Sequence, residues 1–104
     1  MKTINTYETF QTFIKQPLTV IHAKTKQCNV CVSVGAQLES LIEAYPTVPF
    51  GQIFLEDIPV FQGQHLIFTV PTVVIFSKGK EILRESRFID FKRIDRLLAL
   101  YIDE

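Results

Sequence analysis

Two short runs of the chain are apolar at almost every position, LTVIHA at residues 18–23 and TVVIF at residues 72–76. A strand with one face in water alternates apolar and polar residues, whereas a strand covered on both faces does not. The first run is interrupted only by Thr19 and His22, and the second is rich in the β-branched residues that favour strands. Both runs therefore predict central strands of a sheet that is packed on both faces.

Three other segments have apolar residues at helical spacing. The first lies between a capping-box pattern at Asn5 and Glu8 and the helix-breaking Pro17, with the stripe Tyr7, Phe10, Phe13 and Ile14. The second begins near Cys28 and stops before Pro46, with the stripe Val34, Leu38, Leu41, Ile42 and Tyr45. The third has Asp90 as its N-cap and the stripe Phe91, Ile94, Leu97, Leu98 and Tyr101, with Lys92, Arg93 and Arg96 facing water. These patterns predict three amphipathic helices.

The remaining segments complete an alternating order of elements. FGQIFLE at 50–56 is typical of a strand, and EDIPVFQGQHL at 56–66 of a short helix with an acidic cap and Pro59 in its first turn. SKGK turns the strand at 72–76 into EILRESRF at 81–88, which predicts a hairpin, and a short strand near Ile4 is compatible with the pattern. The order (β)αβαβαββα predicts an α/β fold with a central mixed sheet and helices on both faces. At 104 residues, without repeat or linker, the chain is expected to form a single domain over residues 1–104.

Charge and hydropathy exclude several classes of partner. Eleven basic and eleven acidic residues balance without forming blocks, so the chain is not expected to bind nucleic acid or an anionic membrane. The N-terminus lacks the apolar run of a signal peptide, and no stretch has the ~20 apolar residues needed to span a bilayer. The expected location is the cytoplasm, where a lone Cys-x-x-Cys indicates redox or metal chemistry rather than a structural disulfide.

The only two cysteines stand in CNVC, at the junction of the strand at 18–23 and the second helix. At the first turn of a helix, free N–H groups and the helix dipole stabilise a thiolate, so Cys28 is expected to be the reactive thiol, assisted weakly by Lys26. Cys31 lies one turn deeper and is expected to be the less reactive thiol. Residues three apart on a helix are close enough to form a disulfide, so the pair could cycle between dithiol and disulfide.

Two other interpretations of the cysteines remain. A zinc site would need two further ligands, and the only histidines, His22 and His65, are predicted on a strand and in a distant helix. Two inert core cysteines are the other alternative, although the polar neighbours Lys26, Gln27 and Asn29 argue for an exposed junction.

CNVC after a buried strand, followed forty residues later by VPTVVIFSKGKE, resembles the thioredoxin family over nearly the whole chain. The resemblance implies a thioredoxin fold, with Cys28 as attacking thiol, Cys31 as resolving thiol and no bound cofactor or metal. It also implies that Pro71 is preceded by a cis peptide bond beside the cysteines. Val70, Pro71 and Thr72 would then form the turn that pairs with an extended substrate peptide. From the residues alone, a trans proline that merely starts the strand is the alternative.

The chain also departs from the family pattern. Gln27 replaces the usual tryptophan, and Asn29-Val30 replace the usual Gly-Pro between the cysteines. His22 stands where the family keeps a buried acid that exchanges protons with the resolving cysteine, and Gln52 stands where a lysine usually faces that acid. A glycine at the rim of the peptide groove is replaced by Arg87 or Phe88, so partner choice is not carried over from the family.

Two functions from different classes follow from these residues. The first is a thiol-disulfide oxidoreductase acting as a protein-disulfide reductase in the cytoplasm, with disulfide-containing proteins as substrates and a thioredoxin reductase or another thiol donor as electron source. The second is a protein-binding module that keeps the fold but rarely turns over its cysteines. Within the first, a neutral His22 behind Cys31 is a candidate proton acceptor, and a hydrogen-bonded core histidine is the alternative.

Overall fold

The computed structural model describes residues 1–102. Its elements follow in the order β1 (Lys2–Thr3), α1 (Tyr7–Phe13), β2 (Thr19–Lys24), α2 (Asn29–Ile42), β3 (Phe50–Phe54), α3 (Pro59–Gln64), β4 (Thr72–Ser77), β5 (Lys80–Ser86) and α4 (Phe91–Ile102). This is the predicted order, and the short first strand is present. No helix among residues 1–102 has the length and apolar character needed to cross a membrane.

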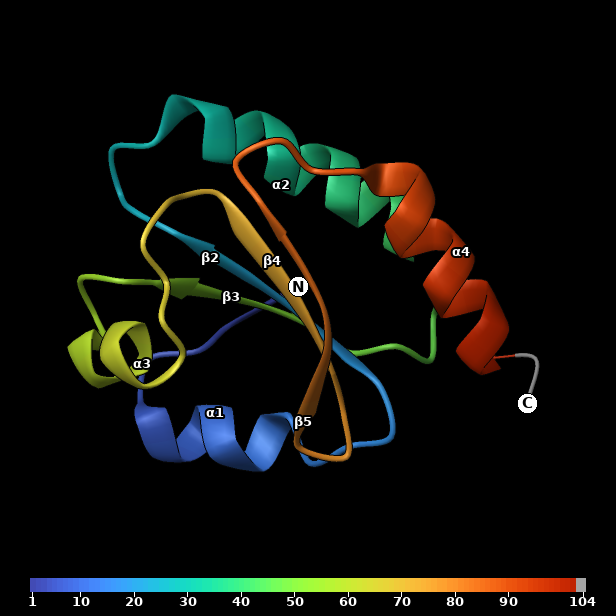
Figure 1. The fold of residues 1–104 in the computed structure, drawn as a ribbon, viewed down its shortest axis with the longest axis horizontal. Helices are drawn as coiled ribbons and strands as arrows, with labels where there is room; N and C mark the ends of the chain where they lie inside the picture. Colours follow the sequence, from blue (N-terminus) through green and yellow to red (C-terminus); the bar gives the residue numbers. More distant parts are fainter. Residues whose placement is uncertain (103–104) are drawn as a thin grey trace.

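The five strands form one mixed sheet in the order β1-β3-β2-β4-β5 (Figure 1). β3 lies between β1 and β2 and runs parallel to both, whereas β4 runs antiparallel to β2 and pairs with β5 as a hairpin. The two apolar runs thus become β2 and β4, adjacent strands in the interior of the sheet, as predicted.

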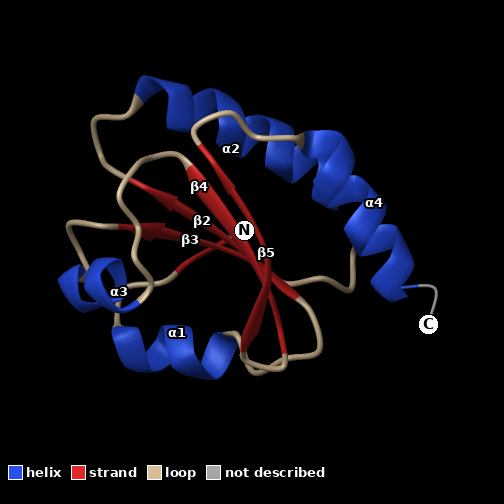
Figure 2. Ribbon diagram, in the orientation of Figure 1, coloured by secondary structure: helices blue, strands red, loops and turns tan. Residues whose placement is uncertain are grey.

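Helices cover both faces of this sheet, α1 and α3 on one face and α2 and α4 on the other (Figure 2). On β2, Ile21 and Ala23 pack into the core cluster that includes Phe10 of α1 and Phe61 of α3. Val20 points to the opposite face and packs into the cluster formed with α2 and α4. Because both faces of β2 are covered, five of its six residues are buried, including the polar Thr19 and His22.

Three chain segments meet at one end of the sheet. Ala23 near the end of β2 is paired with Thr72 at the start of β4, and Thr72 is paired with Ser86 at the end of β5. The segment that leads into α2, the loop before β4 and the loop after β5 therefore all leave the sheet at this end, which we call the loop end (Figure 1).

Two of the predicted helix starts are wrong in detail. The N-cap of α1 is Thr6 rather than Asn5, because the Thr6 hydroxyl accepts a hydrogen bond from the Thr9 N–H at 3.1 Å. The N-cap of α3 is Ile58, with no side-chain cap. The acidic residues expected there bind Lys26 instead. Glu56 accepts from the Lys26 backbone N–H at 2.9 Å, and Asp57 forms an ion pair with its ammonium at 3.0 Å.

The last helix begins as predicted, since a carboxylate oxygen of Asp90 accepts from the Arg93 N–H at 3.1 Å. Ile94 and Leu98 are fully buried, and Phe91 and Leu97 pack partly against the same core. Tyr101, the last residue of the predicted apolar stripe, is 40% exposed, and Leu98 is the last residue of α4 that belongs to the core.

Candidate active site

Cys28 and Cys31 open helix α2 at the loop end, and they are joined by a disulfide with their Cα atoms 5.2 Å apart. Cys28 is the N-cap residue, and its sulfur accepts a hydrogen bond from the Cys31 N–H at 3.1 Å. Cys28 is half-buried, whereas Cys31 is only 1% exposed. The pair thus has the asymmetry predicted from sequence, with an outer sulfur at the positive end of a helix and an inner sulfur one turn deeper.

The charge of Lys26 is engaged away from the cysteines. Its ion pair with Asp57, strengthened by the nearby Glu56, raises the pKa of this exposed ammonium above its usual value. A cation already paired with a carboxylate adds little to the field at a neighbouring thiol. The N-terminus of α2 is therefore the principal stabiliser of a Cys28 thiolate among these groups.

The residues predicted to form the substrate-side turn also lie at the loop end. The Val70–Pro71 peptide bond is cis, as expected, and Pro71 is buried. The Thr72 hydroxyl donates to the Thr69 carbonyl at 2.7 Å and lies 3.1 Å from the Ser86 hydroxyl. Among residues 1–102, the backbone N–H and C=O of Val70 have no hydrogen-bond partner, so both remain available to a bound peptide.

His22 lies behind the cysteine pair, on the face of β2 that is covered by α2. Its side chain is fully buried, and a Cβ atom at Gly35 would lie 3.6 Å from its Cε1 atom. Gly35 is on the buried face of α2, one turn after Cys31, so the imidazole faces the same stripe of the helix as the inner cysteine.

The imidazole of His22 is neutral at pH 7, as predicted. Burial disfavours the imidazolium and the nearby Lys24 ammonium repels it, so the pKa of His22 is lowered from 6.5 to about 4. Neither ring nitrogen has a hydrogen-bond partner among residues 1–102. Gln52 is paired with His22 across the strands, and its amide nitrogen donates to the Thr3 hydroxyl at 2.8 Å.

The second histidine lies on the other side of the sheet. His65 follows α3 and packs against Phe10, Phe61 and Phe76 of the α1 and α3 face. It is therefore separated from His22 by the sheet itself. The structure brings together no group of three or more metal-ligating side chains within residues 1–102.

Comparison with known proteins identifies the family. YdfQ, a thioredoxin-like protein of Bacillus subtilis, is 31% identical to the chain over 99 residues, which cover 94% of this chain and 88% of that protein. The chain belongs to the thioredoxin family. A thioredoxin of Chlamydia caviae is 30% identical over 93 residues, or 89% of this chain and 88% of its own length. No protein-family model matches the chain.

Solved structures show the same fold at low sequence identity. Thioredoxin of Malassezia sympodialis superposes with a TM-score of 0.85 over 97% of this chain and 90% of its own, at 19% identity. Thioredoxin of Plasmodium falciparum gives a TM-score of 0.84 over 97% and 99% of the two chains, at 14% identity. The fold is therefore the thioredoxin fold, and with its Cys28–Cys31 pair the protein is a thiol-disulfide oxidoreductase.

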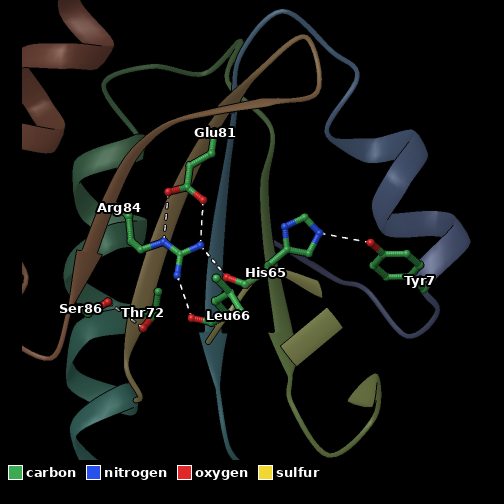
Figure 3. Close-up of polar contacts among 7 residues, drawn as sticks. All are labelled: Tyr7, His65, Leu66, Thr72, Glu81, Arg84 and Ser86. Carbon is green, nitrogen blue, oxygen red and sulfur yellow. Dashed lines mark hydrogen bonds and ion pairs between the residues drawn. The ribbon is translucent and has the colours of Figure 1, made fainter. Parts of the chain in front are cut away.

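Sequence reasoning missed the contacts of Arg84 and Glu81 at the end of α3, where the loop toward the substrate-side turn begins. Arg84 of β5 donates to the backbone carbonyls of His65 and Leu66 and to the carboxylate of Glu81 (Figure 3). On an edge strand rich in charged residues these two side chains resemble ordinary solvent-facing positions. The contacts depend on long-range packing, and no local pattern indicates them.

Proposed function

We propose that this thioredoxin-family protein is a protein-disulfide reductase that acts through Cys28 and Cys31. The observation that carries the proposal is the unequal placement of the two sulfurs, the outer one capping α2 and the inner one 1% exposed. Only the outer sulfur is open to a bulky substrate disulfide, and the inner sulfur can reach it without backbone movement.

The reaction consists of two thiol-disulfide exchanges. The Cys28 thiolate attacks one sulfur of the substrate disulfide, forming a mixed disulfide and releasing the first substrate thiolate, which takes a proton. Cys31, once deprotonated, attacks the Cys28 sulfur and releases the second substrate thiolate. The substrate gains two electrons, and the protein ends as the Cys28–Cys31 disulfide, the state in the structure.

His22 is the proposed acceptor of the Cys31 proton. Its imidazole is neutral and faces the stripe of α2 that carries Cys31, and a neutral imidazole can accept a proton. The alternative of a hydrogen-bonded core histidine has no support from the contacts, because neither ring nitrogen has a partner among residues 1–102.

The substrate polypeptide is proposed to bind along Val70, Pro71 and Thr72. The backbone N–H and C=O of Val70, which have no partner within residues 1–102, support this assignment, because an extended peptide binds through such main-chain groups. The exposed side chain of Phe88 and the neighbouring Arg87 at the same end of the sheet would border that peptide.

Alkylation and trapping test the roles of the two thiols. With limiting iodoacetamide near pH 7, the reduced protein is expected to be alkylated at Cys28 well before Cys31, and Cys31→Ser is expected to accumulate mixed disulfides through Cys28. Cys28→Ser is the matched control and should trap no substrate. Equal labelling of both thiols, or trapping through Cys31, contradicts the assignment.

The proton acceptor has a separate test. His22→Phe keeps a ring of similar size and removes the base, so resolution of a preformed mixed disulfide should slow and lose its wild-type pH dependence while Cys28 alkylation stays unchanged. Resolution with the wild-type pH profile contradicts the role of His22.

Turnover and redox potential separate the reductase from the binding module. A reductase reduces insulin disulfides when a thioredoxin reductase or another thiol donor regenerates it, and its Cys28/Cys31 couple lies at or below the cytosolic glutathione potential of roughly −220 to −260 mV. An intact fold without exchange would favour the binding module.

We further propose that the protein is located in the cytoplasm, because reducing systems there keep such a dithiol reduced. Cell fractionation with trapping of the in vivo thiol state tests this.

A further inference from the structure

Arg84 holds the end of helix α3 from the neighbouring edge strand. Its Nη2 atom donates to the His65 carbonyl at 2.6 Å, and its Nη1 atom donates to the Leu66 carbonyl at 3.0 Å. The opposite side of the guanidinium binds both carboxylate oxygens of Glu81, at 3.1 Å from Nε and 2.8 Å from Nη2 (Figure 3). Glu81 therefore fixes the plane of the guanidinium, and the two carbonyls accept hydrogen bonds from the Nη1 and Nη2 atoms of Arg84.

A break in the strand register makes this arrangement possible. Residues three apart on a regular strand face opposite sides of a sheet. Here Arg84 is paired with Val74 and Glu81 with Phe76, and the register shift between them skips Ile82. Val74 and Phe76 both belong to the core cluster beneath α1 and α3. The bulge at Ile82 thus puts Glu81 and Arg84 on the same face of the sheet, the one that α3 covers.

The end of α3 is a place where the backbone needs outside support. The last carbonyls of a helix have no partner within it, and α3 is only six residues long. Its chain reverses at Leu66, which has a φ of 54°, a left-handed conformation that leucine rarely adopts. The Ile67 N–H then bonds back to the Gln62 carbonyl at 3.0 Å, closing a Schellman-type turn. Arg84 binds the carbonyls of the two residues at this reversal.

The side chain of His65 anchors the same point from the other direction. Its Nε2 atom lies 3.2 Å from the Tyr7 hydroxyl of α1, and its ring packs against Phe10 at a centroid distance of 5.0 Å and against Phe61 at 5.2 Å. The backbone of His65 is thus fixed to β5 and its ring to α1. The start of the loop before β4 is consequently attached to the core on both sides.

The far end of this loop is fixed to β5 as well. The Pro71 carbonyl accepts from the Arg87 N–H at 2.8 Å, and the Thr72 hydroxyl lies 3.1 Å from the Ser86 hydroxyl. Residues 67–70 therefore form a short segment with β5 contacts at both ends. The segment carries Phe68, whose side chain is 83% exposed, and Val70, whose backbone N–H and C=O have no partner in the described part of the chain.

We propose that Arg84, oriented by Glu81, is a positioning residue for substrate polypeptides, and that it acts by holding segment 67–70 in the geometry that receives a peptide beside Cys28. This inference rests on the proposed reductase function. Arg84 has no part in the exchange chemistry, so it affects only the affinity for the polypeptide that flanks the substrate disulfide. Small disulfides, which need only the sulfur of Cys28, do not depend on it.

Steady-state kinetics with two substrates test the proposal. For Arg84→Ala, we expect the KM for insulin to rise about tenfold with kcat nearly unchanged, the pattern of lost binding that is equal in ground and transition states. The rate with the small disulfide 5,5′-dithiobis(2-nitrobenzoate) should stay at the wild-type value. Arg84→Lys keeps the charge but lacks the planar fork that reaches both carbonyls and the carboxylate, so it should not restore the KM.

The matched control is Arg93→Ala. Arg93 also pairs with a glutamate of β5, Glu85, at 3.0 Å, but it does so from α4 on the other face of the sheet. This variant should keep the wild-type KM for insulin. Should Arg84→Ala fail to fold, Glu81→Gln retains the arginine and loses only its orienting charge, and a smaller rise in KM is then expected.

The two proposals fail in different ways. If the wild-type protein does not reduce insulin, the reductase function is wrong and the docking role of Arg84 falls with it. If the wild type reduces insulin and Arg84→Ala and Glu81→Gln keep its KM, or if the rate with the small disulfide falls as much as the rate with insulin, only the positioning role is wrong.

Discussion

Acid should destabilise the protein through His22, and replacing this residue should remove that part of the pH dependence. The folded protein holds the pKa of His22 at about 4, whereas the unfolded chain has the usual value of 6.5. The unfolded state therefore binds a proton more readily below pH 6.5, so stability is fully present above that pH and falls as the pH decreases toward 4. Because each pKa unit corresponds to roughly 1.4 kcal/mol, the loss of stability is about 1 kcal/mol at pH 5.5 and about 2–3 kcal/mol at pH 4.5.

Urea unfolding of the oxidised protein, followed by far-UV circular dichroism, gives the free energy of unfolding at pH 7.5, 5.5 and 4.5. His65 also has a lowered pKa, because its ring is partly buried and near Arg84, so the wild type and His22→Phe will both lose stability in acid. The difference between the two proteins isolates His22. His22→Leu provides a second apolar replacement in case the larger ring is not accommodated.

From pH 7.5 to pH 4.5, the free energy of unfolding of the variant is expected to rise relative to that of the wild type by about 2–3 kcal/mol. At pH 7.5 the variant should lose no more stability than repacking of the larger ring costs. Removing the imidazole breaks no hydrogen bond among residues 1–102, because neither ring nitrogen of His22 has a partner there. Stability curves that run parallel through this pH range would show that His22 is not held neutral by its surroundings, and the case for a buried base would fail with it.

Three backbone substitutions are expected to change stability, and thermal unfolding of the oxidised proteins measures each. Gly35→Ala should raise the free energy of unfolding by about 0.5–1 kcal/mol, because alanine is the better helix former and its Cβ would lie at an ordinary contact distance, 3.6 Å, from the ring of His22. A loss of stability would mean that this site cannot accommodate a methyl group. The same change at Gly51 should destabilise by about 1–3 kcal/mol, because its Cβ would lie 2.8 Å from the Cδ1 atom of Ile4; an unchanged melting temperature would contradict the tight packing. Leu66→Gly should raise the free energy of unfolding by roughly 0.5–1 kcal/mol, since glycine adopts a φ of 54° without the steric strain of a leucine side chain. A lower melting temperature would indicate that the contacts of the exposed leucine side chain stabilise the protein by more than the backbone strain destabilises it.

The order of the elements and the placement of the cysteines could be predicted because they depend on local signals. A few neighbouring residues are enough to recognise the apolar runs that form β2 and β4 and the polar junction before Cys28. Helix starts were less predictable, because Asn5 and Thr6 are both good caps and only the final geometry selects Thr6.

Other features depend on contacts between distant segments. Glu56 and Asp57 fit the sequence pattern of a helix cap. In the structure both side chains bind Lys26, about thirty residues earlier in the chain, instead. In the sequence, Arg84 resembles a solvent-facing strand residue. In the structure, the bulge at Ile82 places Arg84 and Glu81 on the same face, and Arg84 binds the end of α3. The burial of His22 was predictable from its apolar neighbours. That its ring nitrogens have no hydrogen-bond partner among residues 1–102 depends on which side chains face it across the core.

The sulfur that reacts is also the sulfur that caps α2, so the redox state and the order of the first helical turn are thermodynamically linked. In the disulfide, the Cys31 N–H donates to a neutral sulfur at 3.1 Å. In the reduced protein the same N–H would face a Cys28 thiolate, and a charged acceptor makes the stronger hydrogen bond. Extra stability of the reduced form raises the reduction potential of a dithiol couple. Substitutions at Asn29 or Val30 that improve the geometry of this turn would therefore make the protein a weaker reductant, even though they leave both sulfur atoms in place.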